Sequence, residues 1–261
     1  MKVALCYSGQ VGAFHKAYSW QKSSFITENM DVYIYTSDLI SQKANSFPNL
    51  PPASKIHEYL PGGKGWRKNI GTYGIIYKTD KKNINKVLLP LRDKSVKIEI
   101  ESEDLLDSTQ DWDMSKWEWL KKRQLSKLHK CNQMIEEEYD IVVRTRFEFG
   151  PKVRIPIEEL FSSVKNNQNK IFLFGGWKCV PPMVFMDKFM CDGFAFGSQK
   201  AMNTFCSLGL QEEPYPYDLR YEDCWHKFGD NVEYQFQKHL EANGLEPVLI
   251  GQKRSMYHLW R

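Results

Sequence analysis

Two arginines and a glutamate alternate at the end of one apolar segment of the sequence. Residues 140–143, Asp-Ile-Val-Val, are typical of a buried strand, and Arg144, Arg146 and Glu148 follow at intervals of two. Side chains two positions apart on a strand share a face, so both guanidinium groups are expected side by side. A guanidinium offers forked donors to phosphate oxygens and neutralises a diphosphate without a metal ion. A structural Arg–Glu ion pair at the strand end is the alternative interpretation.

A glycine turn follows the first apolar run of the sequence. Residues 3–7 are apolar, and Ser8, Gly9 and Gln10 come directly after them. A glycine between a strand and a helix lets backbone N–H groups and the helix N-terminus approach an anion or a nucleotide. Neither a G-x-G-x-x-G fingerprint nor a P-loop is present. An ordinary strand-to-helix turn is therefore the alternative here.

Four short motifs occur in the chain in this order: Ser8-Gly9-Gln10, Tyr139-Asp140, Arg144-Thr145-Arg146-Phe147-Glu148 and Asp192-Gly193-Phe194-Ala195-Phe196-Gly197. Together they resemble the motifs of a broad set of bacterial and viral glycosyltransferases of the GT-A superfamily. The resemblance covers most of the chain and is weakest between residues 41 and 110. The resemblance implies a nucleoside diphosphate sugar as donor and a glycan or other hydroxyl compound as acceptor. It also implies that Gln10 lies near the base or ribose of the donor.

The same resemblance raises the question of a metal ion. In the wider superfamily the equivalent strand ends in Asp-x-Asp, which holds a divalent ion against the donor diphosphate. Arg146 stands in the place of the first Asp and Glu148 in the place of the second. Mn²⁺ and Mg²⁺ need oxygen ligands, so Glu148 is the candidate metal ligand, but one Glu beside an Arg is a poor site by itself. Arg144 and Arg146 are the physical substitute for the ion.

Acidic residues in the second half of the chain are candidates for proton transfer. An inverting transfer needs one carboxylate to take the proton of the acceptor hydroxyl. Asp192 follows an apolar segment and precedes a glycine, which suits a carboxylate on the floor of a cleft, although Asp-Gly is also a common turn pair. The resemblance makes Asp192 a ligand of a sugar hydroxyl as well. Rival acids, each equally suited to the first turn of a helix, are Glu222, Asp223 and Glu233.

Several other chemistries lack support. The six histidines form no H-x-x-x-H or H-E-x-x-H pattern, the six cysteines form no C-x-x-C pair, and G-x-S-x-G is missing. A net charge of +4 without a basic stripe gives no reason to expect nucleic acid as a partner. No stretch approaches the roughly 20 apolar residues of a membrane span, so we expect no transmembrane segment and a cytoplasmic protein.

The predicted elements alternate between strands and helices, as in parallel βαβ units. Strands are expected at residues 3–7, 31–36, 96–100, 139–149, 171–174, 191–198 and 247–250. Helices are expected at residues 13–28, 115–138, from 199 onward and 231–243. Open parallel sheets bind ligands beyond the carboxyl ends of their strands, where the arginines and the glycine turn would meet.

The sequence therefore predicts one GT-A-like α/β domain over residues 1–261, with a mostly parallel mixed central sheet flanked by helices. A long irregular loop at about 41–73, rich in Pro, Gly, Ser and Asn, is expected to order over the donor. The predicted function is a glycosyltransferase that moves a hexosyl or pentosyl group. The alternative is a non-catalytic protein that binds a nucleotide sugar or carbohydrate, which the lack of Asp-x-Asp supports.

Overall fold

The computed structural model describes residues 1–11, 14–41, 76–78, 80–103, 117–118, 121–175, 190–216, 232–251 and 257–259 of the 261-residue chain. The predicted loop at 41–73 and the predicted helix start at Ser115 lie almost entirely outside these residues.

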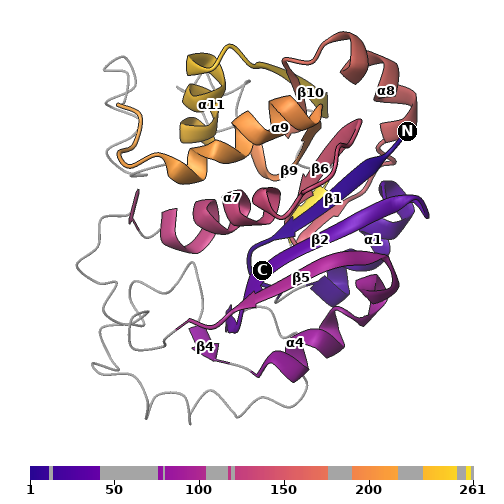
Figure 1. The fold of residues 1–261 in the computed structure, drawn as a ribbon, viewed down its shortest axis with the longest axis vertical. Coiled ribbons are helices and arrows are strands. Elements are labelled where there is room, and N and C mark those ends of the chain that lie inside the picture. The colour runs from indigo at the N-terminus through magenta and orange to yellow at the C-terminus, as the bar shows by residue number, and fades with distance from the viewer. Residues whose placement is uncertain are drawn as a thin grey trace.

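A seven-stranded sheet forms the centre of the molecule (Figure 1). Its strand order is β10-β8-β9-β6-β1-β2-β5. All neighbouring strands pair in parallel except β9, which runs antiparallel to both β6 and β8. The strands in chain order are β1 (Val3–Ser8), β2 (Met30–Ser37), β5 (Ser95–Glu101), β6 (Ile141–Thr145), β8 (Lys170–Gly175), β9 (Met190–Gly197) and β10 (Glu246–Gly251).

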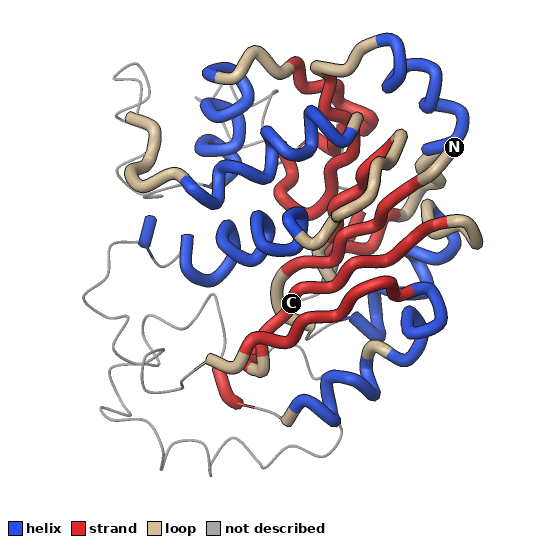
Figure 2. The backbone as a smooth tube through the Cα atoms, viewed as in Figure 1, coloured by secondary structure: helices blue, strands red, loops and turns tan. Residues whose placement is uncertain are grey.

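Helices cover both faces of this sheet (Figure 2). One face packs against α1 (Phe14–Ser24), α4 (Lys81–Val87), the 3-10 helix Leu89–Lys94 and α8 (Ile157–Asn166). The other face packs against a π-helical turn (Lys121–Leu125), α7 (Ser126–Gln133), α9 (Gln199–Cys206) and α11 (Val232–Ala242). The two-layer cover means that the central strands must be apolar on both sides.

Strand β1 shows how the sequence satisfies this demand. All six of its side chains are buried. Leu5 and Tyr7 join the core under α1, and Ala4 and Cys6 join the core under α7. A strand buried on both faces reads as a continuous apolar run rather than as an alternation, which is why residues 3–7 were recognisable as a central strand.

Two antiparallel pairs lie outside the main sheet. β3 (Leu39–Ser41) pairs with β4 (Ile76–Lys78), and together they bracket the segment 42–75. β7 (Phe149–Pro151) pairs with β11 (Tyr257–Leu259). Neither pair was expected from the sequence, since three-residue strands are too short to show periodicity.

The predicted α/β architecture, a mostly parallel mixed sheet flanked by helices, is confirmed, and it fits the GT-A-like fold that the resemblance implied. The strand expected at 139–149 ends at Thr145, because a turn at residues 147–148 follows. The helix expected up to 138 ends at Gln133. Helices α4 and α8 were not expected. In the described residues of α4 only Ile84 is buried, so its sequence shows almost no apolar stripe.

No helix in the described part of the chain is both long enough and apolar enough to cross a membrane.

Candidate functional site at the carboxyl edge of the sheet

The parallel strands deliver the predicted site residues to one edge of the sheet. Tyr7 of β1 is the register partner of Thr145 of β6, so Ser8–Gln10 and Arg146–Glu148 leave the sheet side by side. Antiparallel β9 begins at this same edge, and Thr145 pairs with Phe194. Asp192 therefore lies close to the arginines, although it is 46 residues from Arg146 in sequence.

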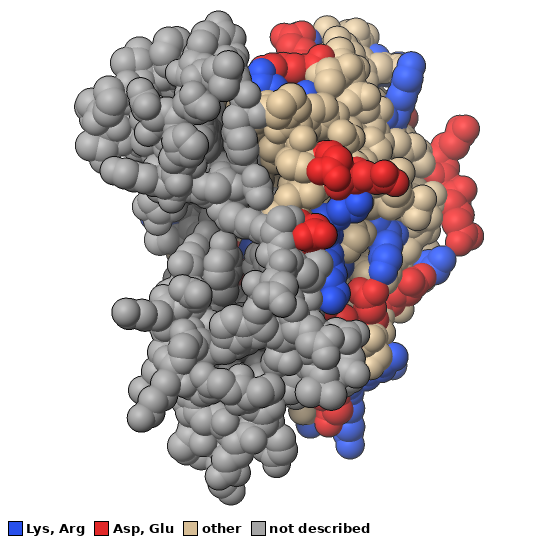
Figure 3. All heavy atoms as spheres, turned by 90° about the vertical axis from the view of Figure 1, so that its left-hand side faces the viewer, with Lys and Arg blue, Asp and Glu red and all other residues tan. Residues whose placement is uncertain are grey.

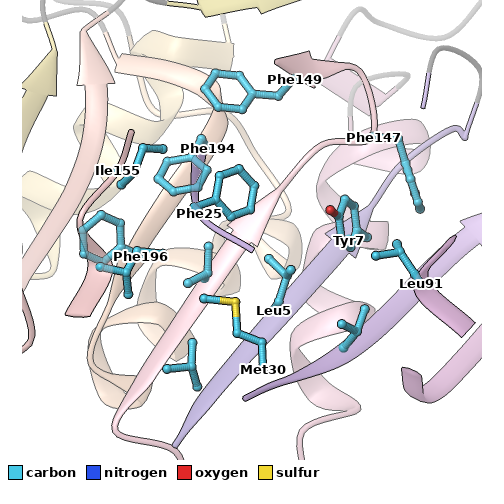
Figure 4. Packing of buried hydrophobic residues seen from close by; sticks show 14 of the residues in the cluster. Leu5, Tyr7, Phe25, Met30, Leu91, Phe147, Phe149, Ile155, Phe194 and Phe196 are labelled. Carbon is cyan, nitrogen blue, oxygen red and sulfur yellow. The ribbon is translucent and has the colours of Figure 1, made fainter. Parts of the chain in front are cut away.

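An aromatic layer supports the turn that carries Arg146 and Glu148. Phe147 stacks on Tyr7 with ring centroids 5.1 Å apart, and Phe149 stacks on Phe194 at 5.5 Å (Figure 4). Phe147 and Phe149 are both fully buried in the core under α1. Arg146 and Glu148, which alternate with these two residues, do not join this core and pair with each other.

The side chain of Gln21 in α1 holds the backbone of residues 146–149 in place. Its Nε2 donates to the carbonyl oxygens of Arg146, Phe147 and Phe149 at 3.2, 3.3 and 2.7 Å. Its Oε1 accepts a hydrogen bond from the Tyr7 hydroxyl at 2.7 Å. A buried amide with all these partners is a strong local constraint, because each partner would otherwise be left unpaired.

Arg146 bridges two carboxylates. Its Nη1 lies 2.5 Å from Oδ2 of Asp192, and its Nη2 forms an ion pair with Glu148. Gln124, from the π-helical turn before α7, donates its Nε2 to the same Asp192 oxygen at 2.5 Å. The side chain of Arg146 is 25% exposed, that of Glu148 14% and that of Asp192 6%. The Arg–Glu pair that the sequence left open is thus present, with Asp192 as a third member.

An irregularity in β9 helps to place Asp192. Between β8 and β9, Leu173 pairs with Ala195 and Gly175 with Met190. Two steps along β8 therefore correspond to five steps along β9, so β9 carries extra residues at its start. Such a bulge interrupts the strict alternation of faces and re-aims a side chain. Phe194 faces the core under α1, whereas Asp192 reaches Gln124 on the side of α7.

The charges of this cluster shift one another's pKa values. Burial alone would raise the pKa of Asp192, but the guanidinium groups of Arg146 and Arg144 and the hydrogen bond from Gln124 lower it below its usual value. Burial disfavours the charged form of Arg146, yet Asp192 and Glu148 outweigh it and raise the pKa of Arg146. Asp192 is therefore a stably ionised carboxylate, suited to accept hydrogen bonds and less suited to take up a proton near pH 7.

Arg144 differs from Arg146 in its partners. It is 1% exposed, and within the described part of the chain its Nε and Nη1 have no hydrogen-bond partner. Burial lowers the pKa of Arg144, and the charge of Asp192 offsets this only in part. A buried guanidinium with two unused donors is energetically costly, and such a group calls for a partner.

The glycine turn after β1 has the backbone that the sequence suggested. Gly9 has φ +110°, which L side chains rarely adopt, and no atom lies within 4 Å of the position where a Cβ would stand. The backbone N–H of Gly9 donates to the Tyr35 carbonyl at 3.3 Å, and the Thr36 hydroxyl donates to the Gly9 carbonyl at 2.7 Å. The turn is thus tied to the end of β2, and its backbone has a conformation that glycine adopts without strain.

Sequence reasoning missed three side chains around the site. Gln124 and Gln21 are amides in otherwise helical segments, and no local pattern distinguishes them from surface residues. Asp38 lies at the end of β2, 3% exposed, and accepts hydrogen bonds from the Ser102 hydroxyl and the Glu103 backbone N–H, both at 2.9 Å. The polar run Thr36-Ser37-Asp38 directly after an apolar strand was the signal for this last residue.

The structure does not describe the side chains of three predicted acids. Glu222 and Asp223 lie outside the described residues, and Glu233 belongs to α11 without a described side chain. In the part of the chain that the structure describes, no three His, Cys, Asp or Glu side chains come together as metal ligands. Glu148 and Asp192 both face a guanidinium, so these described residues by themselves do not fit a divalent cation.

Acidic and basic side chains both occur over the described residues of the face drawn in Figure 3.

A hollow of about 410 Å³ lies at the opposite, amino-terminal edge of β8 and β10, between the segments 166–169, 200–204 and 243–245. It is not part of the candidate site.

The described residues thus form an α/β fold with a cluster of two arginines, two carboxylates and a glycine turn at the carboxyl edge of its sheet. No family model matches this sequence, and no curated protein matches it. Among solved structures, the chain is similar to the apo form of the glycosyltransferase GlyE of Streptococcus pneumoniae TIGR4, with 10% identity and a TM-score of 0.41. The match covers 95% of this chain and 45% of that protein, so this chain spans less than half its length.

Proposed function

We propose that this chain is a glycosyltransferase whose nucleoside diphosphate sugar binds at the carboxyl edge of the sheet. One observation carries the proposal: the buried guanidinium of Arg144 has two nitrogen donors without a partner in the described part of the chain. A diphosphate supplies the charge and the oxygens that such a group needs. The positive-φ turn at Gly9, on the neighbouring strand, is suited to the nucleotide part of the donor.

In the proposed reaction the acceptor oxygen forms a bond to the anomeric carbon of the donor sugar. The bond from that carbon to the phosphate oxygen breaks, and the nucleoside diphosphate leaves with the electron pair. Arg144 stabilises the charge that develops on the leaving group. The ionised Asp192 accepts hydrogen bonds from sugar hydroxyls. Because its pKa is lowered, the acceptor proton goes to another carboxylate, for which Asp223 and Glu233 are the candidates.

A thermal-shift screen over UDP-, GDP- and dTDP-sugars tests the binding step. The matching nucleotide sugar stabilises the folded state by mass action, by about 2.7 kcal/mol at 100 times its Kd. The variant Arg144→Met removes the donors while keeping an apolar side chain of similar length, so we expect it to lose this shift. If none of these compounds raises the Tm of the wild-type chain, the proposal is wrong.

A non-catalytic nucleotide-sugar-binding protein is the second candidate. The lowered pKa of Asp192 favours it, because that carboxylate is a weak general base. Assays of donor hydrolysis and of transfer to a mixture of sugar acceptors separate the two. Release of nucleoside diphosphate that Arg144→Met abolishes supports the enzyme, and binding without any release supports the second candidate.

A further inference from the structure

We propose that Arg146 is a built-in cation that occupies the place between Glu148 and Asp192 where a divalent metal ion would otherwise bind. The inference rests on the proposed function only for the identity of the anionic ligand. It is carried by the way in which Arg146 holds the two carboxylates and by the way in which the backbone holds Arg146.

The two carboxylates come from different strands and converge on one cation. Glu148 follows β6, and Asp192 lies at the start of β9. Each nitrogen at the end of the guanidinium takes one of them, Nη1 taking Asp192 at 2.5 Å and Nη2 taking Glu148. Two carboxylates from separate elements, completed by phosphate oxygens, are the usual ligand set of Mg²⁺ in nucleotide sites. Here a guanidinium joins the same pair.

Arg146 is held in place by its backbone as well as by its side chain. Its N–H donates to the Gly193 carbonyl at 2.9 Å, next to Asp192. Its carbonyl accepts hydrogen bonds from Gln21 and from the Phe149 N–H, both at 3.2 Å. A free metal ion loses translational freedom when it binds, whereas a guanidinium that is already tethered beside the carboxylates does not. Arg146 therefore competes with a metal ion for Glu148 and Asp192 at a high effective concentration.

The charges of the cluster are already balanced. Arg144 and Arg146 supply two positive charges, and Glu148 and Asp192 supply two negative charges. A divalent ion added beside Arg146 would face two nearby guanidinium groups, which repel it. We therefore expect ligand binding at this edge to need no metal ion, and we expect removal of Arg146 to expose a site for one.

The test uses the full chain and three variants. Arg146→Asp places a carboxylate beside Glu148 and Asp192, and Arg146→Lys keeps the charge without the fork. Arg154→Asp is the matched control, because Arg154 pairs with Glu159 at 3.6 Å on an exposed surface. The Tm of each protein is measured with EDTA, Mg²⁺ or Mn²⁺, and Mn²⁺ binding is measured separately by electron paramagnetic resonance.

We expect the Tm of the wild type to be the same with EDTA as with Mn²⁺. Arg146→Asp should gain about 5 °C at an Mn²⁺ concentration 100 times its Kd, whereas Arg146→Lys and Arg154→Asp gain nothing. Mn²⁺ that binds tightly to the wild type, or stabilises Arg154→Asp as much as Arg146→Asp, overturns the inference. If Arg146→Asp does not fold, the wild-type measurements with Mn²⁺ and EDTA decide.

A second arm separates this inference from the proposed function. UDP and GDP are titrated into the wild type with EDTA and with Mn²⁺, and the midpoints should agree within about twofold for the nucleotide that binds. Binding that requires Mn²⁺ overturns the inference and leaves the proposed function standing. If neither nucleotide binds under any condition, a UDP- or GDP-linked donor is excluded, while the Mn²⁺ measurements on Arg146→Asp still judge the role of Arg146.

Discussion

Replacing Arg146 by Met should destabilise the fold strongly, because it leaves two poorly exposed carboxylates without their shared cation. Removing one partner of a buried ion pair costs about 3–5 kcal/mol. A quarter of the Arg146 side chain is exposed, so the lower end applies, about 3 kcal/mol. For a domain of this size that loss lowers the Tm by roughly 6 °C or more. Urea unfolding followed by tryptophan fluorescence measures the free energy of unfolding directly.

The pH dependence of this loss distinguishes charge from packing. The pKa of Asp192 is lower in the folded chain than in the unfolded chain, so its ion pair stabilises the fold above the unfolded pKa of about 3.9. That contribution is lost as the pH falls through the folded pKa. In Arg146→Met the carboxylate of Asp192 loses the guanidinium that lowers its pKa, so it becomes protonated more easily. The difference in unfolding free energy between wild type and variant should therefore shrink from pH 7 to pH 4.

The control is Arg154→Met, which removes an arginine from an exposed pair, with the side chain of Arg154 74% exposed and that of Glu159 68% exposed. Exposed pairs contribute about 0–1 kcal/mol, so this variant should stay close to the wild type. Equal losses at both arginines, or a loss at Arg146 that is the same at pH 7 and pH 4, would refute the reasoning.

Two substitutions and one labelling experiment test the surroundings of the site. Gln21→Leu leaves the Tyr7 hydroxyl and the carbonyls of the 146–149 turn without their partner, so urea unfolding should show a loss of about 3 kcal/mol, whereas Gln133→Leu on the exposed side of α7 should change little. Gly9→Ala meets no steric contact but forces an L residue to φ +110°, so it should lose about 1–3 kcal/mol in the same assay. The hydrogen bond with Cys131 and burial raise the pKa of the Cys6 thiol, and burial raises the pKa of the Cys206 thiol. Peptide mapping after a brief treatment with iodoacetamide should therefore find both unmodified in the folded protein and modified in urea.

The strands could be predicted from the sequence because the fold buries them on both faces. Residues 3–7 and 171–174 are continuous apolar runs. The strand found at the first is one residue longer at its C-terminal end, and the strand found at the second is one residue longer at each end. Helix α4 could not be found in the same way, because Ile84 is its only buried residue among those described. Helix α8 does carry an apolar stripe at helical spacing, formed by Ile157, Leu160, Phe161 and Val164, and was missed although that signal is present; it begins after Pro156 without a side-chain cap that would mark its start.

The location of the candidate site could be predicted from the sequence, but the contacts between its residues could not. The strand ending in Arg144–Glu148 and the turn at Gly9 were both expected at one edge of a parallel sheet, and the structure places them on adjacent strands. The contact between Arg146 and Asp192 was not predictable, since it depends on antiparallel β9 and on the extra residues at its start. Gln124 was missed for a related reason, because only the packing of the π-helical turn brings it to Asp192.

Arg144 and Arg146 look equivalent in the sequence, but they have different surroundings in the structure. Arg146 is saturated by Glu148 and Asp192, whereas Arg144, two residues earlier, is more deeply buried and has donors without a partner in the described part of the chain. An ion pair whose hydrogen bonds are all made, as at Arg146, fixes the geometry of its members. A buried cation with unpaired donors, as at Arg144, is stabilised when an anion binds to it. If a ligand binds at this edge, its free energy of binding includes relief of the cost at Arg144, and the Arg146 bridge keeps Asp192 in place for it. Arg144 then accounts for affinity and Arg146 for preorganisation, so their substitutions should affect different measured quantities.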